Sequence, residues 1–151
     1  MAKGGKKKGP RTQKDPLVKK EPRVSPDTNP EAILSKKPVW LLGTMDLYGP
    51  WGWRKIRKVS LLEAIHEKLK NFETMTWGSI YGPQNHFISR SSLCKEAQKR
   101  LAEKKLDDYD KFFTLRLTGK QRVWGIREKE IFKILWWDPK HEVCPAVKKH
   151  T

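Results

Sequence analysis

Three short segments in the C-terminal third of the chain alternate apolar and polar residues with a period of two. Residues 113–117 read FTLRL, and a glycine-containing turn then leads to residues 122–127. A charged turn follows and leads to the apolar residues 131–137, after which Asp138 and a proline end the pattern. A period of two is typical of β-strands, and proline cannot continue a strand ladder. We therefore predict three antiparallel strands joined by short turns.

An earlier segment has the spacing of an amphipathic helix. Ser60 and Glu63 form a capping-box pattern, in which each side chain satisfies a backbone amide of the first turn. Apolar residues then recur at helical spacing up to about residue 71. The pattern predicts a helix over residues 60–71.

A second helix is predicted to begin after Ser91 or Ser92, both of which are good N-cap residues. Its apolar stripe consists of Leu93, Ala97 and Leu101. The basic residues of this segment, Lys95, Lys99, Arg100, Lys104 and Lys105, are expected on its solvated side. Residues 76–90, which contain two glycines and a proline, are predicted to form the loop between the helices.

A short apolar run at residues 39–42 is a candidate strand ahead of the helices. The order is therefore strand, helix, helix and three antiparallel strands, which favours an α+β fold. We predict two helices packed on one face of a small antiparallel sheet, forming a single domain over residues 38–151.

Residues 1–37 differ in composition from the rest of the chain. They contain no aromatic residue, and 11 Lys and Arg stand against four Asp and Glu. Such a segment buries too little apolar surface to offset its ordering entropy, so we predict a disordered basic tail. Lys6, Lys7 and Lys8 are candidate phosphate contacts within it. The alternative is a tail that only increases solubility.

The net charge of the chain is +16, with a pI near 10, and this makes an acidic partner the expectation. Nucleic acid is the commonest such partner, although a basic surface can also serve solubility alone. The cations of the three-strand segment, Arg116, Lys120, Arg122 and Arg127, are the candidate nucleic-acid contacts.

No apolar run reaches the ~18 residues of a membrane span, and no apolar stretch follows the basic N-terminus as in a secretory signal. Two cysteines give no disulfide framework, so we expect a protein of the reducing cytoplasm.

Aromatic residues are concentrated between Trp40 and Trp137, where all seven tryptophans fall. The segment 48–53 interleaves three aromatic rings with turn residues, which suits either a stacking platform for unpaired bases or a loop pinned to the core. Trp136 and Trp137 are adjacent in a predicted strand and should therefore point to opposite faces of the sheet.

The spacing of two arginines provides a test of a shared site. Arg116 and Arg122 lie on one face only if an odd number of residues closes their turn. Gly119 permits a three-residue loop over 118–120, which would set the two arginines opposite each other. A planar guanidinium grips two phosphate oxygens and remains charged, so such a pair suits a phosphate site.

The last strands resemble those of a known toxin family. The segments Leu115-Arg116-Leu117 and Arg122-Val123, the apolar strand 131–137 and the ending His141-Glu142-Val143 are similar to the C-terminal sheet of RelE/YoeB-type toxins. The two preceding helices occupy the places that this family gives them. Its members are small bacterial ribonucleases that bind the ribosomal A site, cut mRNA there and are neutralised by a co-encoded antitoxin.

The resemblance implies roles for individual residues. Arg116 and Arg122 match the arginines that hold the scissile phosphate, and His141 matches a residue that acts on the leaving group. The chain departs from the family at Cys144, where a tyrosine is common, and it lacks a clear acidic general base. Asp107 and Asp108 are the nearest acidic candidates.

The expectation is thus an RNA-binding protein of RelE-like type that acts as a metal-independent endoribonuclease on mRNA at the ribosome. The expected partners are RNA or the ribosome and a small acidic antitoxin, with no membrane. No cofactor is expected, and the scattered His86, Cys94, His141 and Cys144 lack the paired spacing of a zinc site. The alternative is a non-catalytic nucleic-acid-binding or ribosome-associated protein that uses its basic tail and sheet face for charge alone.

Overall fold

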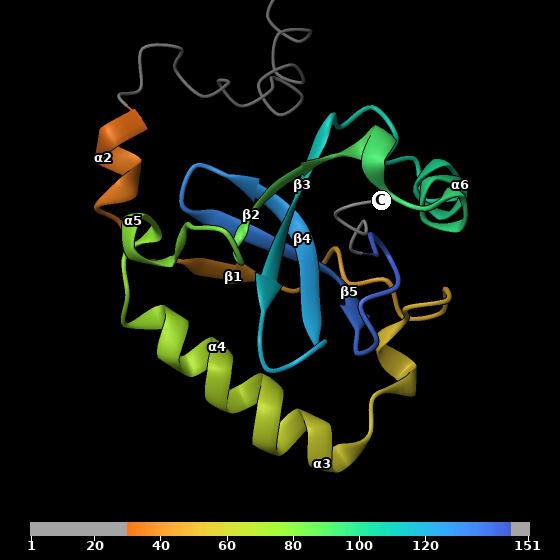
Figure 1. Ribbon diagram of the computed structural model, residues 1–151, viewed down its shortest axis with the longest axis horizontal. Coiled ribbons are helices and arrows are strands. Elements are labelled where there is room, and N and C mark those ends of the chain that lie inside the picture. The colour runs from red at the N-terminus through yellow and green to blue at the C-terminus, as the bar shows by residue number, and fades with distance from the viewer. Residues whose placement is uncertain (1–29, 146–151) are drawn as a thin grey trace, which may run out of the picture. The chain divides into compact units, whose positions relative to one another are not determined.

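The computed structural model describes residues 30–145, which form a five-stranded sheet with helices on both sides (Figure 1). The strands are β1 (Val39–Leu41), β2 (His86–Ser89), β3 (Lys111–Arg116), β4 (Arg122–Glu128) and β5 (Ile131–Asp138). Their order across the sheet is β1-β5-β4-β3-β2. The three antiparallel strands predicted from the period of two are confirmed as β3, β4 and β5.

The expectation of an entirely antiparallel sheet is wrong, because the edge strand β1 runs parallel to β5. Val39 pairs with Ile131 and Leu41 pairs with Lys133. A parallel pair cannot be closed by a hairpin and needs a long crossover. Here the connection contains every element of the chain between β1 and β5, so the apolar run at 39–42 predicted the strand but not its partner.

The helices of the described residues are α2 (Pro30–Leu34), α3 (Lys58–Ser60), α4 (His66–Glu73), α5 (Trp77–Ile80) and α6 (Lys95–Glu103). A π-helical turn, Leu61–Ile65, joins α3 to α4, and short 3₁₀ turns lie at Trp53–Lys55 and Arg90–Ser92. No helix in the described part of the chain has the length and apolar character needed to cross a bilayer.

Both predicted helix starts are wrong. The first helical run begins at Lys58, so Ser60 already has helical angles and its side chain makes no capping bond. The second begins at Lys95, because the buried Leu93 is extended and the amide of Cys94 donates to Val143 O at 2.8 Å. Tertiary contacts therefore fix this start, and local capping does not.

The segment predicted as a loop, residues 76–90, contains two elements. Thr76 caps α5, with its Oγ1 accepting a hydrogen bond from the amide of Ser79 at 3.2 Å. β2 then pairs with β3 in antiparallel register, from His86 opposite Thr114 to Ser89 opposite Lys111. This edge strand matters for the site described below.

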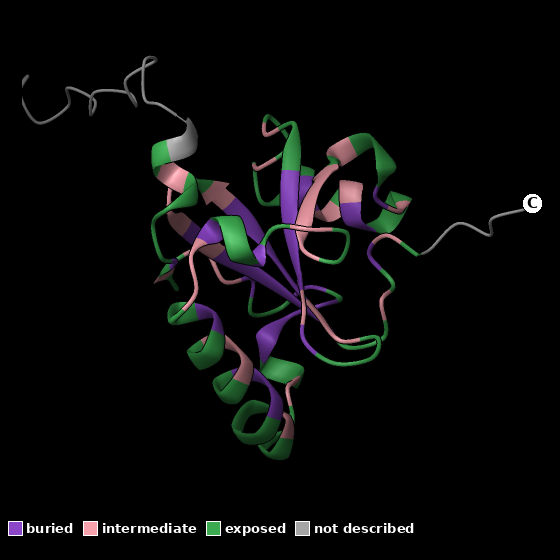
Figure 2. Ribbon diagram, turned by 60° about the vertical axis from the view of Figure 1, so that its left-hand side comes forward, coloured by how far each residue is buried: buried purple, intermediate pink, exposed green. Residues whose placement is uncertain are grey.

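The two helices were expected on one face of the sheet, but the helices cover both faces. Ile65 and Phe72 of the first helical run pack with Phe113 in one core cluster. Ala97 and Leu101 of α6 pack with Phe112 in a second cluster. Because neighbouring strand residues point to opposite faces, the two clusters lie on the two sides of the sheet. Figure 1 shows the sheet between α4 and α6, and Figure 2 shows buried residues along its strands.

The aromatic segment around residue 50 is pinned to the core, as one of the two interpretations predicted. Trp51 packs on Trp136 with ring centroids 5.2 Å apart, and Trp53 packs on Trp137 at 6.0 Å. The Trp53 indole N–H also donates to Leu135 O at 3.0 Å. Trp136 and Trp137 belong to different core clusters, which confirms that they point to opposite faces.

A buried ion pair joins this segment to α6. The carboxylate of Asp46 is 0% exposed and accepts two hydrogen bonds from the Arg100 guanidinium, both at 2.8 Å, and one from Trp136 Nε1 at 2.9 Å. The amides of Tyr48 and Gly49 donate to the same carboxylate. Burial alone would raise the pKa of Asp46, but these hydrogen bonds hold that pKa well below its usual range. Arg100 is thus a structural residue and not part of a solvated face.

Ile33, which precedes the predicted boundary at residue 38, packs against the core, and Lys36 O accepts a hydrogen bond from the amide of Trp77 at 2.9 Å. Most of the predicted tail, with Lys6, Lys7 and Lys8, lies outside the described residues.

Candidate functional site

A cavity of about 500 Å³ opens where the β3–β4 hairpin, β2 and the segment after β5 meet. We call it the cationic pocket. Its lining residues are Pro83, Gln84, His86, Ile88, Thr114, Arg116, Arg122, His141, Cys144 and Pro145. The three residues predicted to be catalytic, Arg116, Arg122 and His141, all line this one pocket.

The two arginines lie directly opposite each other on β3 and β4. The amide of Leu117 donates to Gln121 O at 2.9 Å and closes a three-residue loop in which Gly119 has a φ of +50°. This confirms the odd loop predicted from Gly119. Only glycine adopts such a backbone conformation without strain.

Both guanidinium groups are held by the same backbone carbonyl. Arg116 Nε donates to Gly119 O at 3.2 Å, and Arg122 Nη1 donates to it at 2.8 Å. Each guanidinium has five N–H donors, so most of them remain available to an anion. Burial lowers the pKa of Arg122, and the positive charge of the neighbouring Arg116 lowers it further. An anion bound between them would relieve this repulsion.

His141 reaches the pocket from the turn that follows β5. The buried carboxylate of Asp138 holds this turn, because its Oδ1 accepts from the amide of Glu142 at 2.8 Å and its Oδ2 accepts from that of Val143 at 3.0 Å. The Trp124 indole also donates to Asp138, at 3.1 Å. His141 itself has a φ of +57°, a left-handed conformation that is uncommon for a residue with a side chain.

The surroundings of His141 favour its neutral form. Burial lowers the pKa of His141 most, and the positive charges of Arg122, Lys120 and Arg116 lower it further, while Asp138 partly offsets them. Lys120 lies exposed in the hairpin loop. A neutral imidazole at neutral pH can accept a proton, and a bound phosphate would raise its pKa.

Two lining residues, His86 and Thr114, were not predicted as members of this site. They are paired across β2 and β3, and Thr114 is two residues before Arg116, so all three side chains share one face. Thr114 is only 3% exposed. Within residues 30–145, neither His86 Nδ1 nor Thr114 Oγ1 has a hydrogen-bond partner, although both atoms are buried.

Unpaired buried polar atoms are rare, since each one costs about 1–3 kcal/mol. Both of these atoms belong to residues that line the cationic pocket. His86 was missed because β2 was predicted as loop. Thr114 was missed because a threonine at an alternating strand position carries no signal of its own.

Arg127, a predicted nucleic-acid contact, lies on the other face of the sheet. Its guanidinium carbon lies 4.8 Å from the ring centroid of Trp77, 5.1 Å from that of Phe87 and 5.5 Å from that of Phe113. Burial lowers the pKa of Arg127. The structure therefore separates Arg127 from the arginines of the cationic pocket.

The acidic candidates Asp107 and Asp108 are exposed residues between α6 and β3, and neither lines the cationic pocket. No carboxylate is among the residues that line it. In the described ranges, no group of three or more His, Cys, Asp or Glu residues is arranged to hold a metal ion.

Comparison with protein-family models, curated proteins and solved structures finds no significant match to this chain.

Proposed function

We propose that this protein binds RNA in the cationic pocket and cleaves it there with its own side chains, as an endoribonuclease of RelE/YoeB type. The observation that carries the proposal is the convergence of Arg116, Arg122, His86 and His141 on one pocket that contains unpaired buried polar atoms. The resemblance of residues 115–143 to the toxin sheet supports the same class of reaction.

RNA cleavage without a metal ion requires three groups. A base removes the proton of the 2′-hydroxyl, cations stabilise the charge on the phosphorane, and an acid protonates the departing 5′-oxygen. The Arg116 and Arg122 guanidinium groups suit the second task, because their planar forks match the phosphate oxygens. Thr114 lines the same pocket, and its hydroxyl is the candidate for one more hydrogen bond to a phosphate oxygen.

The two histidines divide the proton transfers. His86 lines the pocket and is the base that takes up the 2′-hydroxyl proton. His141 is the acid: phosphate binding offsets the arginine charges that lower its pKa, so it takes up a proton when substrate arrives. The 2′-oxygen then attacks phosphorus and the bond to the 5′-oxygen breaks. The products are a 2′,3′-cyclic phosphate and a 5′-hydroxyl.

The test is cleavage of a fluorescent oligoribonucleotide in the presence of EDTA, with analysis of the product ends. We expect cyclic-phosphate ends, no cleavage where the scissile 2′-hydroxyl is replaced by hydrogen, and loss of cleavage in His86→Gln and His141→Gln. His66→Gln is the matched control, since His66 is an exposed residue of α4, the helix that covers the opposite face of the sheet from the pocket.

The narrower proposal, taken from the resemblance, is action on mRNA at the ribosome with an acidic antitoxin as inhibitor. It predicts growth arrest on induction, and its relief by His141→Gln. Unimpaired growth and intact RNA, together with salt-dependent RNA binding, would instead establish the non-catalytic nucleic-acid-binding protein.

A further inference from the structure

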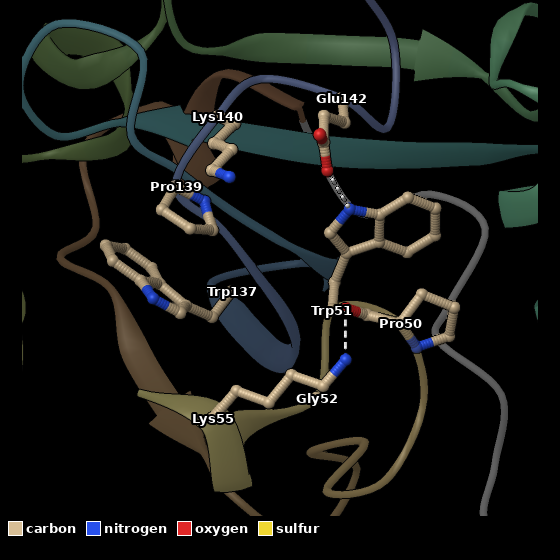
Figure 3. Close-up of a pocket in the computed structure, with 8 residues that line it drawn as sticks. All are labelled: Pro50, Trp51, Gly52, Lys55, Trp137, Pro139, Lys140 and Glu142. Carbon is tan, nitrogen blue, oxygen red and sulfur yellow. Dashed lines mark hydrogen bonds between the residues drawn. The ribbon is translucent and has the colours of Figure 1, made fainter. Parts of the chain in front are cut away.

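A second cavity, of about 330 Å³, lies beside the aromatic segment (Figure 3). We call it the aromatic pocket. Its lining residues are Pro50, Trp51, Gly52, Lys55, Trp137, Pro139, Lys140 and Glu142. Figure 3 shows the indoles of Trp51 and Trp137 on opposite sides, with Lys140 and Lys55 at opposite ends. Its volume lies at the small end of the ~300–1,000 Å³ typical of ligand sites.

The two pockets share one short turn. Lys140 and Glu142 line the aromatic pocket, whereas His141 between them lines the cationic pocket. The positive φ of His141 accompanies this division of the turn between two cavities. Consecutive Cα atoms are ~3.8 Å apart, so the turn residues that line the two pockets are close in space. Ligands bound in the two pockets would therefore be neighbours.

The two pockets differ in the chemistry that they offer. The cationic pocket has arginines, histidines and no lining carboxylate, which suits a phosphate. The aromatic pocket contains the carboxylate of Glu142, which would repel a phosphate. The indole N–H of Trp51 donates to Glu142 Oε1 at 3.4 Å and orients that carboxylate against the pocket wall.

Aromatic and proline side chains make much of this pocket apolar, so a planar ring with a polar edge fits it better than a charged group. A carboxylate accepts hydrogen bonds from amino groups, as in the pairing of Glu with the N4 amino group of cytosine. Lys55 and Lys140 are exposed at the rim, where they can meet the phosphates that flank a bound base.

We propose that the aromatic pocket holds the base of a nucleotide adjacent to the phosphate in the cationic pocket, and that Glu142 selects bases with an exocyclic amino group over uracil. This inference rests on the proposed binding of RNA. Glu142 then determines the base preference of the protein, and it does not line the cationic pocket in which cleavage is proposed.

The test uses 2′-O-methylated tetranucleotides of adenosine, cytidine or uridine, which cannot be cleaved through the 2′-oxygen. Binding is followed by tryptophan fluorescence and by the NMR signal of the Trp51 indole N–H. We expect tighter binding of the adenosine and cytidine probes than of the uridine probe, by about tenfold, consistent with one good polar contact to a base. Glu142→Gln should abolish this preference, because an amide offers a donor to uracil oxygens as well as an acceptor.

The matched control is Glu63→Gln, since Glu63 is an exposed residue of the first helical run and lines neither pocket. Equal affinity for the three probes, or a preference that survives in Glu142→Gln, would overturn the inference. Because no probe is cleaved, the outcome is separate from catalysis. Cleavage of natural RNA without this preference would leave the proposed function standing, and the preference without cleavage would leave the base site standing.

Discussion

Two buried polar clusters lie against the sheet face that α6 covers, and they differ in how completely their hydrogen bonds are satisfied. Asp46 is fully buried, and its two oxygens accept bonds from Arg100, Trp136 and two backbone amides. His86 and Thr114, at the cationic pocket, each bury an atom that no described residue satisfies. The first cluster is complete without a ligand, and the second is not.

The two clusters lie on the same side of the sheet, but one stabilises the fold and the other is available to a ligand. A saturated buried ion pair is strongly destabilising to break, because removal of one partner leaves the other charge buried. An unsatisfied group already carries its desolvation cost, so its removal costs the fold little. Substitutions in the Asp46 cluster should therefore affect folding, and those in the cationic pocket should affect ligand binding.

The largest effect is expected for Asp46→Ala. It leaves the Arg100 guanidinium and the Trp136 indole without an acceptor, and should lower the free energy of unfolding by about 3–5 kcal/mol. Denaturant unfolding measures this value. Asp107→Ala, at an exposed position, is the control and should change stability little. A loss below about 1 kcal/mol for Asp46→Ala would show that the saturated cluster does not stabilise the fold.

Arg122 should affect the reaction and leave the fold nearly unchanged. Arg122→Ala should raise the activation free energy of cleavage by about 2.7–4 kcal/mol, the range for loss of an oxyanion donor. Arg122→Lys retains the charge without the two-pronged grip, so we expect an increase of about 1–3 kcal/mol with RNA affinity little changed. Cleavage rates and affinities of the two variants, with Arg57→Ala as an exposed control, provide the measurement. A parallel fall of rate and affinity in Arg122→Lys would make Arg122 a binding residue only.

Thr114→Val should have opposite effects on stability and on binding. Loss of an unpaired buried hydroxyl should leave stability unchanged or raise it by up to about 1–3 kcal/mol, while phosphate binding weakens. Thr44→Val is the matched substitution, since Thr44 Oγ1 donates to Ile134 O at 2.8 Å and its loss should destabilise by about 1 kcal/mol. Thermal unfolding and phosphate titration of both variants test the contrast. Equal destabilisation by the two would show that Thr114 is not an open site.

The smallest effect concerns pH. The pKa of His141 is lower in the folded protein than its ordinary value, so the unfolded chain binds protons more readily. Stability should therefore fall as pH drops below about 6.5, the ordinary pKa of histidine, and rise again towards neutral pH. Phosphate should raise the pKa of His141, as measured by NMR titration, and His141→Gln should remove this part of the pH dependence. A pKa that does not respond to phosphate would place the anion elsewhere.

The sequence predicted the parts of the fold that depend on local pattern. The period of two identified β3, β4 and β5, and the glycine at position 119 predicted the loop that aligns Arg116 with Arg122. The start of α6 was not predictable in this way, because a contact between Cys94 and Val143, some fifty residues later, determines it.

The same limit applies to the candidate site. His86 joins the pocket only through the pairing of β2 with β3, which no local pattern indicated. The position of Arg127, by contrast, was predictable. It follows Arg122 by five residues, and strand residues an odd number of positions apart point to opposite faces of the sheet.

The position of β5 between β1 and β4 has a consequence for how the chain folds. β1 finds its partner about 90 residues later in the sequence, whereas β2, β3 and β4 can pair with near neighbours. Closing so long a loop carries an entropic cost that must be met before the contact forms, so non-local pairings of this kind are slow. We therefore expect the antiparallel strands to assemble early and the docking of Val39–Leu41 on β5 to complete folding as a late, separate step.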